Sequence, residues 1–544
     1  MNTEISKKLL FTVLAAFLSV SAANSETTAD PEILYSVTFQ VTEASSEMPV
    51  GTFFQAEDKN GRVRFSAGIE GGYNTSRQSD PMRMTVSFSD GNSAIKKTVI
   101  PPPADVHHGS LFQLRGDIFM ENSQDDAAYR LRDDESGWDK VDSDFISDLF
   151  CSGNPELCAQ LPTCYRQLDV TGVMVRNRYC ATVGNRIVWA ATDASVFKGL
   201  PSDKLAPVRL NGGILVLAYT ADPANGAGFL VCAIPAQRKI RGDDCLPSRY
   251  SDAADFPYAI IGNGDRLFLF SSYGSVRYFD KKAKKIIETR KANTLLEGYE
   301  TTSYQIYAAL RFNDSILLGG YPLSIVQLLA PDGKITAFAK PLPEVRLYGE
   351  VQTFSAFNNT ILAGVWPWGQ VWSLDPVSLE WRLFDRLFSH PSTSGLSQFD
   401  SDNEPYVAKL GTNQFGQRVQ SVAKRGNAIY FMTGAKDGYI QDALPKTGFT
   451  DAQLNEYGAV HKYEATGQMA FDLPDAIQKG DLFGFEVTAN WLRVTRNGRR
   501  IASTPVAIGE EFCLANLHLG KGLYGKLTWA KAVFVKAGGK LKCS

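Results

Sequence analysis

Seven times along this chain, a pair of turn-forming residues is followed directly by a short apolar run that reads as a β-strand. The pairs are Gly116-Asp117, Gly184-Asn185, Gly212-Gly213, Gly264-Asp265, Asn313-Asp314, Asn358-Asn359 and Gly426-Asn427. Glycine, asparagine and aspartate tolerate the left-handed backbone that tight hairpins need, so each pair predicts a hairpin. A repeat of small antiparallel sheets is typical of β-propellers. The repeat therefore predicts an all-β chain that contains a propeller.

The spacing of the pairs sets the number of propeller blades. A four-stranded blade uses about 40–50 residues, and successive pairs from residue 213 to residue 359 are 52, 49 and 45 residues apart. Gly184-Asn185 comes only 28 residues before the next pair, so we interpret it as a different turn of the second blade, with residues 151–165 inserted as a loop. The predicted count is seven blades, with six and eight as alternatives.

Two further segments with strand-like alternation flank the propeller. Residues 31–100 and 480–538 each contain several short alternating runs. Neither segment is long enough for a comfortable domain, but together they reach the size of a two-sheet sandwich. We therefore expect a jelly-roll-like β-sandwich built from both ends of the chain, with its parts at 26–100 and 480–544 and the propeller at 101–479.

The first 25 residues have the pattern of a signal peptide. Lys7 and Lys8 precede an apolar run over residues 9–20, and small residues follow. This order of charge, apolar run and small residues favours cleavage near residues 23–25 and export, so the expected location is secreted or periplasmic. An uncleaved anchor is the alternative. No other run is long enough to predict a membrane span.

The chain has eight cysteines, an even number that fits disulfides in an exported protein. The spacing suggests that Cys232 pairs with Cys245 and that Cys513 pairs with Cys543, and it leaves four cysteines to pair within residues 151–180. A zinc site at Cys151, Cys158 and Cys164 is the alternative, although no C-x-x-C pair or nearby histidine supports it.

Candidate site residues come from the loops that precede the innermost strands, because these loops converge at one mouth of a propeller channel. The repeat register places there His107, His108, Arg178, Tyr179, Arg209, Tyr258, Tyr304, Tyr348, Gln417 and Arg418. Arginine pairs with carboxylate or sulfate, tyrosine stacks and donates, and histidine exchanges a proton, so this set suits an anionic sugar. The alternative is that the tyrosines pack between blades and the arginines form salt bridges.

Trp366 and Trp368 suggest a sugar-stacking platform on an exposed loop. Strand alternation explains the two tryptophans equally well, with one facing the neighbouring blade and the other facing solvent. No P-loop, H-E-x-x-H, EF-hand or G-x-S-x-G motif is present in the sequence. We therefore expect neither a metal site nor a cofactor. The net charge of −2 also argues against nucleic-acid partners.

Parts of this pattern resemble known families. Residues 491–499, 514–520 and 525–531 resemble the strands of concanavalin-like and laminin-G sandwiches, and residues 132–138 resemble a degenerate Asp-box of sialidase-type propellers. The whole organisation resembles exported carbohydrate-active propellers, which include polysaccharide lyases and glycosidases.

The resemblance implies a polysaccharide lyase that acts on a uronate glycan. His107 or His108 would be the base, Tyr258 or Tyr304 the acid, and Arg178 or Arg418 the group that neutralises the carboxylate. The alternative is a non-catalytic propeller that binds a glycan or a protein.

Overall fold

The structure is a computed structural model. It describes residues 33–42, 50–70, 83–88, 94–142, 205–233, 241–293, 304–338, 349–390, 417–435, 450–506 and 514–537, with short gaps inside several of these ranges, together with short strands at 74–79 and 168–191. The predicted signal peptide lies outside the described residues. Strands dominate; a 3-10 turn η3 (Gly242–Asp244) and a short helix α6 (Asp451–Leu454) interrupt them. In the described residues, no helix is long and apolar enough to cross a membrane.

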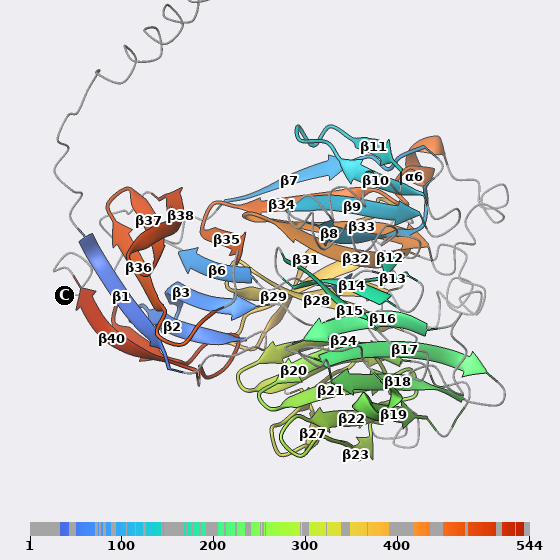
Figure 1. The fold of residues 1–544 in the computed structure, drawn as a ribbon. Coiled ribbons are helices and arrows are strands. Elements are labelled where there is room, and N and C mark those ends of the chain that lie inside the picture. The colour runs from blue at the N-terminus through green and yellow to red at the C-terminus, as the bar shows by residue number, and fades with distance from the viewer. Residues whose placement is uncertain are drawn as a thin grey trace, which may run out of the picture.

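Most strands form four-stranded antiparallel units that follow one another along the chain (Figure 1). The first three units are β8 (Gly109–Leu114), β9 (Asp117–Asn122), β10 (Ala128–Leu131) and β11 (Trp138–Val141); β12 (Leu168–Asp169), β13 (Gly172–Val175), β14 (Arg178–Val183) and β15 (Arg186–Ala191); and β16 (Leu205–Asn211), β17 (Ile214–Asp222), β18 (Gly226–Ala233) and β19 (Cys245–Arg249).

The fourth, fifth and sixth units repeat the same order. They are β20 (Pro257–Asn263), β21 (Arg266–Ser271), β22 (Ser275–Asp280) and β23 (Lys285–Lys291); β24 (Gln305–Phe312), β25 (Ser315–Tyr321), β26 (Val326–Leu329) and β27 (Ile335–Ala337); and β28 (Glu350–Phe357), β29 (Thr360–Trp366), β30 (Gln370–Leu374) and β31 (Trp381–Arg386). The first strands of neighbouring units contact one another, as β24 does with β20 and β28, so these strands line the centre of a β-propeller. The all-β propeller class predicted from the sequence is confirmed.

The seventh unit joins the two ends of the propeller. It consists of β32 (Gln417–Arg425), β33 (Ala428–Ala435) and β34 (Val460–Ala465), and its outer strand is β7 (Ile95–Ile100) from before the first unit. An early strand therefore completes the last sheet, which closes the ring through main-chain hydrogen bonds. If each four-stranded unit is one blade, the described units agree with the predicted seven blades. The blade count itself stays a prediction.

The turn pairs lie where the repeat predicts. Six of them join the first and second strands of a unit, whereas Gly184-Asn185 joins β14 to β15 and is therefore a different turn of its unit. Asn358 and Asn359 have φ angles of 47° and 61°. Two successive positive φ angles are typical of the hairpin turn whose twist matches that of the strands.

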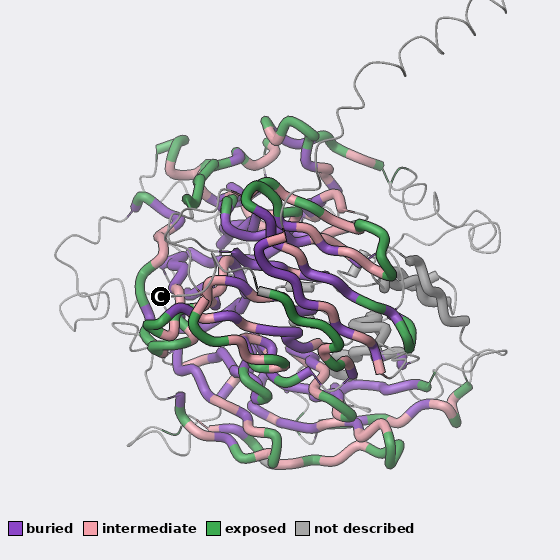
Figure 2. The backbone as a smooth tube through the Cα atoms, turned by 90° about the vertical axis from the view of Figure 1, so that its left-hand side faces the viewer, coloured by how far each residue is buried: buried purple, intermediate pink, exposed green. Residues whose placement is uncertain are grey.

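Both ends of the chain build a two-sheet sandwich beside the propeller (Figure 1). One sheet has the order β38 (Arg499–Pro505), β37 (Trp491–Arg496), β36 (Leu482–Thr488), β1 (Ile33–Val41) and β40 (Ala530–Ala537); the other has the order β35 (Gln468–Asp472), β6 (Arg83–Phe88), β3 (Val63–Glu70), β2 (Gly51–Glu57) and β39 (Asn516–Leu519). Aromatic rings fill the space between the sheets. The ring centroid of Phe53, for example, lies 5.1 Å from that of Phe485 and 5.2 Å from that of Phe39. Figure 2 shows that buried positions follow the strands and that exposed positions gather at turns.

Strand pairing crosses the domain limits expected from the sequence. β7 lies before residue 101 but pairs with β34 of the propeller, and β35 lies before residue 480 but pairs with β6 of the sandwich. The two parts therefore exchange strands at the expected limits of 100 and 480. Periodicity alone does not reveal this exchange, because it identifies strands but not their partners.

A hairpin from the sandwich reaches into the centre of the propeller. Between β3 and β6 the chain forms β4 (Asn74–Thr75) and β5 (Gln78–Ser79); β4 pairs with β20, and β5 pairs with β32. These are the first strands of the fourth and seventh units, so the hairpin bridges two innermost strands that are far apart in the ring. The main chain of the sandwich thereby occupies part of the channel.

The predicted disulfide between Cys232 and Cys245 is confirmed. The two residues lie opposite each other on the neighbouring strands β18 and β19. The side chains of the other six cysteines lie outside the described part of the chain, so their pairing stays a prediction.

Glu135 ties the first unit to the seventh across the closure. It lies in the turn between β10 and β11, the segment that resembles an Asp-box, and accepts hydrogen bonds from Tyr430 (2.7 Å), Lys462 (2.7 Å) and Arg425. Burial raises the pKa of Glu135, but the hydrogen bonds from these three partners lower it more, so the pKa lies below its usual value.

We predict that the Glu135→Gln variant unfolds with a free energy about 1–3 kcal/mol lower than wild type at neutral pH, because hydrogen bonds to a charged group are lost. A carboxyl group with a lowered pKa stabilises the fold above its unfolded-state pKa, about 4.3, and this contribution is lost as the pH falls through the folded pKa. Urea unfolding at several pH values should show a difference that is full at neutral pH and disappears in acid. The control is Asp133→Asn, because the Asp133 side chain is 84% exposed. This substitution should lower the free energy of unfolding by less than about 0.5 kcal/mol. Equal losses in the two variants would contradict this role for Glu135.

Candidate functional site

Three of the predicted residues lie at the start of a first strand: His107, His108 and Tyr258. The two histidines directly precede β8 and are half-buried. Tyr258 lies at the start of β20, where its ring stacks on that of Tyr307 with the centroids 4.6 Å apart. The expected entry positions of these residues therefore fit the strand register.

Tyr304 directly precedes β24 but is fully buried. Its hydroxyl lies 2.9 Å from the carbonyl oxygen of Leu318 and also contacts that of Ile325. Burial raises the pKa of this phenol well above its usual value. A phenol in this environment holds neighbouring strands together, which is the packing alternative considered for this residue.

Arg418 and the two tryptophans are also buried. The Arg418 guanidinium pairs with Glu350 at 3.2 Å and lies over the ring of Trp366. Trp368 packs under the guanidinium of Arg386. The tryptophans therefore form no exposed platform, and the charge of Arg418 is already neutralised by a buried carboxylate.

The remaining predicted positions are less informative. Arg178 and Tyr179 begin β14, the third strand of its unit rather than the first, so they do not belong to an entry loop as expected. Arg209 lies within β16, opposite Val216, and not before it. For these three residues only the main chain is described, and Tyr348 lies outside the described residues.

Trp366, Trp368 and Arg418 lie near further polar residues that the sequence did not single out. His390 pairs with Glu456 at 2.8 Å, and its carbonyl oxygen accepts a hydrogen bond of 2.8 Å from Arg386. This group ties the sixth and seventh units together. Because Glu456 pairs with His390 and Arg386 donates to the His390 carbonyl oxygen, we regard this group as a structural network.

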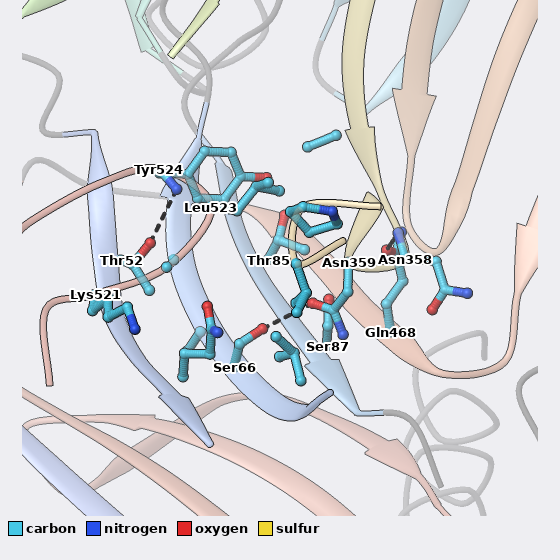
Figure 3. A pocket seen from close by; sticks show the side chains of 18 of the residues that line it. Thr52, Ser66, Thr85, Ser87, Asn358, Asn359, Gln468, Lys521, Leu523 and Tyr524 are labelled. Carbon is cyan, nitrogen blue, oxygen red and sulfur yellow. Dashed lines mark hydrogen bonds between the residues drawn. The ribbon is translucent and has the colours of Figure 1, made fainter. Parts of the chain in front are cut away.

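A cavity in the described structure lies elsewhere, between the sandwich and the propeller (Figure 3). Its volume is about 250 Å³. The sandwich contributes one wall through β2, β3 and β6, and the turn at Asn358-Asn359 between β28 and β29 contributes the opposite wall. The polar residues that line it are Thr52, Gln55, Glu57, Ser66, Thr85, Ser87, Asn313, Asn358, Asn359, Gln468, Lys521 and Tyr524.

Amides and hydroxyls dominate this lining, and several are held in place by hydrogen bonds. Ser66 Oγ donates to Asn359 Oδ1 at 3.0 Å, and the Asn358 main-chain N–H donates to Gln468 Oε1 at 2.6 Å (Figure 3). Each bond joins a sandwich residue to the turn of the sixth unit. The turn is therefore fixed against the sandwich, and its side chains have defined directions.

Two buried atoms of this turn have no hydrogen-bond partner within the protein. They are Asn358 Oδ1, an acceptor, and Asn359 Nδ2, a donor. A buried polar atom without a partner costs free energy, so a polar ligand group that reached either atom would relieve that cost. The sequence showed the turn itself, but its use as a cavity wall depends on the sandwich and was not predicted.

Few charges face the cavity. Both oxygens of Glu57 are engaged, one with Gln55 Nε2 at 2.7 Å and the other with His518 Nε2 at 3.2 Å. Lys521 is exposed and supplies one positive charge. The lining therefore carries one charge of each sign, and no excess of either sign favours an ionic ligand.

A glycine-rich loop over residues 520–526 completes the wall. Gly520, Gly522 and Gly525 have φ angles of 68°, 151° and 76°, which residues with side chains rarely adopt. The loop docks on the turn of the fifth unit, where the Lys526 main-chain N–H donates to Asp314 Oδ1 at 2.6 Å. The contact fixes the loop, and with it the shape of the cavity.

Comparison with known proteins gives no family. No family model matches the chain, and no curated protein matches it. Among solved structures, the extracellular domain of the putative one-component system BT4673 from B. thetaiotaomicron is 12% identical, with a TM-score of 0.38, and the match covers 75% of this chain but only 47% of that one.

Two smaller structures are matched over nearly their whole length. A streptogramin B lyase is 9% identical with a TM-score of 0.36, over 68% of this chain and 98% of its own. The Myceliophthora thermophila Cps50 (Swd1) β-propeller domain is 11% identical with a TM-score of 0.34, over 67% of this chain and 99% of its own. These likenesses carry no argument about function, which therefore has to come from the site.

We predict that Gly525→Ala destabilises the protein more than Gly498→Ala does. Both glycines have a φ of 76°, so alanine costs about 1–2 kcal/mol at either position. An added Cβ at Gly525 would lie 2.4 Å from Asp314 Oδ1, whereas nothing lies within 4 Å at Gly498. Denaturant unfolding should therefore show a further loss of about 1 kcal/mol or more for Gly525→Ala. Equal losses would mean that the loop does not need its contact with Asp314.

Proposed function

We propose that the protein is an exported glycan-binding propeller, and that one uncharged sugar residue occupies the cavity between the sandwich and the propeller. The observation that carries this proposal is the pair of buried, unpartnered atoms Asn358 Oδ1 and Asn359 Nδ2 in a wall of amides and hydroxyls. Export rests on the signal-peptide pattern and agrees with the disulfide between Cys232 and Cys245.

A sugar hydroxyl suits these two atoms because it donates and accepts at once. Neighbouring hydroxyls on one ring offer a donor to Asn358 Oδ1 and an acceptor to Asn359 Nδ2. Tyr524 and Phe357 add ring surface to the lining, and aromatic rings pack against apolar faces. This combination of polar edge and apolar face matches a sugar ring better than it matches an ion or a purely apolar ligand.

The size of the cavity limits the ligand. Sites for drug-sized molecules measure about 300–1,000 Å³, and this cavity, at about 250 Å³, is slightly smaller. It therefore suits one sugar residue at the end of a chain better than an internal stretch of a polymer.

The geometry favours binding over the uronate lyase that the resemblance implied. The lyase needs a free cation and a titratable acid close to its base. Arg418 is paired with Glu350, and the Tyr304 hydroxyl is held by two carbonyl oxygens. For His107, His108 and Tyr258, the position at the channel mouth stays a prediction.

We predict that Asn359→Asp weakens glycan binding about tenfold or more. The substitution keeps an oxygen that accepts from Ser66, but it removes the Nδ2 donor and places a negative charge in a buried position. The ligand oxygen loses its hydrogen bond, and covering the carboxylate adds a desolvation cost. A glycan array would identify the ligand, and titration calorimetry would compare the affinities. The matched control is Asn427→Asp, which changes the corresponding turn residue of the seventh unit outside the cavity and should bind normally.

Two results would overturn the proposal. One is equal binding by wild type and Asn359→Asp, which would place the ligand elsewhere. The other is an unsaturated product from a uronate polysaccharide that disappears in His107→Ala or His108→Ala, which would restore the lyase.

A further inference from the structure

A groove lies on the rim of the propeller between the fourth and fifth units. Its volume is about 500 Å³, and its lining residues are Arg266, Tyr278, Thr289, Asp332, Gly333 and Lys334. The first three belong to β21, β22 and β23, and the last three form the turn between β26 and β27. Figure 1 shows β22, β23 and β27 together at the lower end of the propeller. The groove shares no lining residue with the cavity beside the sandwich, so it is a separate feature.

Arg266 has a fixed position in this groove. Its guanidinium lies over the ring of Tyr278, 4.7 Å from the ring centroid, and its Nη1 donates to the Pro331 carbonyl oxygen at 2.6 Å. A guanidinium carries five N–H donors in a planar fork, so further donors remain for a ligand. A fork that is held in place suits the oxygens of an acidic group.

The two carboxylates closest in the strand register shape turns instead of neutralising this charge. Asp280 faces Arg266 on the neighbouring strand, but its Oδ1 accepts from the main-chain N–H groups of residues 282 and 283 at 2.9 Å and 2.8 Å. Asp332 Oδ1 accepts from the main-chain N–H of Lys334 at 2.9 Å. Aspartate in turns typically bonds to the main chain in this way. Among the residues that the structure describes, no carboxylate forms an ion pair with Arg266 or Lys334.

The strand register extends the positive surface beyond the groove. Arg266 faces Asp280, and Asp280 in turn faces Lys285 on β23. Residues directly opposite in neighbouring strands lie on the same face of a sheet, so Lys285 lies on the face that carries Arg266. Two strand spacings separate the main chains of these two residues by about 10 Å.

Lys285 also ends a basic run. Four of the five residues at 281–285 are lysine, and Lys284 and Lys285 are exposed. Lys282 pairs with Asp265 at 2.6 Å, whereas Lys284 and Lys285 form no ion pair within the described ranges. Short lysine-rich runs of this kind are typical of surfaces that bind anionic polymers.

We propose that this groove binds an acidic polysaccharide, with one acidic group at Arg266 and Lys334 and a later one at Lys285. A single small anion does not reach cations about 10 Å apart, whereas a polymer with repeated acidic groups does. The sign of the charge therefore selects the acidic group, and the spacing of the cations selects a polymer.

The lining favours a polysaccharide over other acidic polymers. Arg266 covers the ring of Tyr278, which leaves no open aromatic face on which a nucleic-acid base would stack. The lining contains no large aliphatic side chain, so it offers no apolar pocket to anchor a peptide. The hydroxyl groups of Tyr278 and Thr289 belong to the lining, and hydroxyls suit the hydroxyl groups of a sugar.

The experiment is titration calorimetry of the full protein with heparin, a sulfated polysaccharide, and with polygalacturonate, a carboxylated one. We expect Lys334→Gln to weaken binding about fivefold or more, because one charge of the site is lost. Arg266→Lys keeps the charge but loses the fork, and it should weaken binding about tenfold or more. The matched control is Lys59→Gln, which removes the same charge from an exposed turn of the sandwich and should bind like wild type. Thermal unfolding checks that each variant is folded.

The outcomes separate the proposal from its alternatives. Absence of binding to both acidic polymers would overturn it. Equal losses in Lys334→Gln and Lys59→Gln would also overturn it, because they would show a diffuse attraction without a site. Polyglutamate that binds as tightly as the polysaccharides, with the same losses in the variants, would assign the groove to an acidic peptide instead. Binding of heparin alone or of polygalacturonate alone would support the proposal and identify the acidic group as sulfate or carboxylate.

Discussion

The sandwich and the propeller are joined by a buried ion pair between Glu70 and Lys424. Their charged atoms lie 3.1 Å apart, and both side chains are almost fully buried, at 3% and 5% exposure. Thr85 donates to the other oxygen of Glu70 at 2.7 Å, and Tyr524 donates to the same oxygen as Lys424. Burial raises the pKa of Glu70, but the charge of Lys424 and these hydrogen bonds lower it more, so the carboxyl group stays ionised. Two buried charges are tolerated only when each keeps its partners, and this requirement fixes the sandwich at one place on the ring.

Other features depend on that fixed position. Glu70 is the last residue of β3, directly before the hairpin β4–β5 that bridges the innermost strands β20 and β32. Thr85 and Tyr524, which bind Glu70, also line the cavity. The ion pair therefore holds the entry of the hairpin and one wall of the cavity at the same time. A ligand in the cavity would therefore contact Thr85 and Tyr524, whose orientation is set by their hydrogen bonds to Glu70. Such fixed side chains reduce the entropy cost of binding.

The turn residues alone predicted much of the fold. Pairs such as Asn358-Asn359 mark hairpins by local backbone chemistry, so the register of the first and second strands followed directly. The sandwich from both chain ends followed from length and alternation. Sequence did not show that β7 and β35 exchange partners, because pairing depends on contacts between distant segments.

The site was predicted less well. The expected residues were chosen by chemistry at the mouth, but Tyr304, Trp366 and Arg418 are buried, and chemistry alone does not distinguish a packed side chain from a free one. The cavity forms only where the sandwich packs against the propeller, so no single segment of the sequence reveals it.

A double-mutant cycle on Glu70 and Lys424 tests the central claim most directly. The variants are Glu70→Gln, Lys424→Met and both together, measured by denaturant unfolding with hydrogen exchange to follow sandwich and propeller strands separately. We predict a loss of about 3–5 kcal/mol in each single variant, because each leaves one buried charge unpaired, and a double variant that loses less than the sum. Protection should fall together in β3 and β32. The exposed pair of Lys282 and Asp265 serves as the reference and should couple by about 1 kcal/mol or less. Losses that add without coupling, or protection that falls in the sandwich alone, would contradict the account.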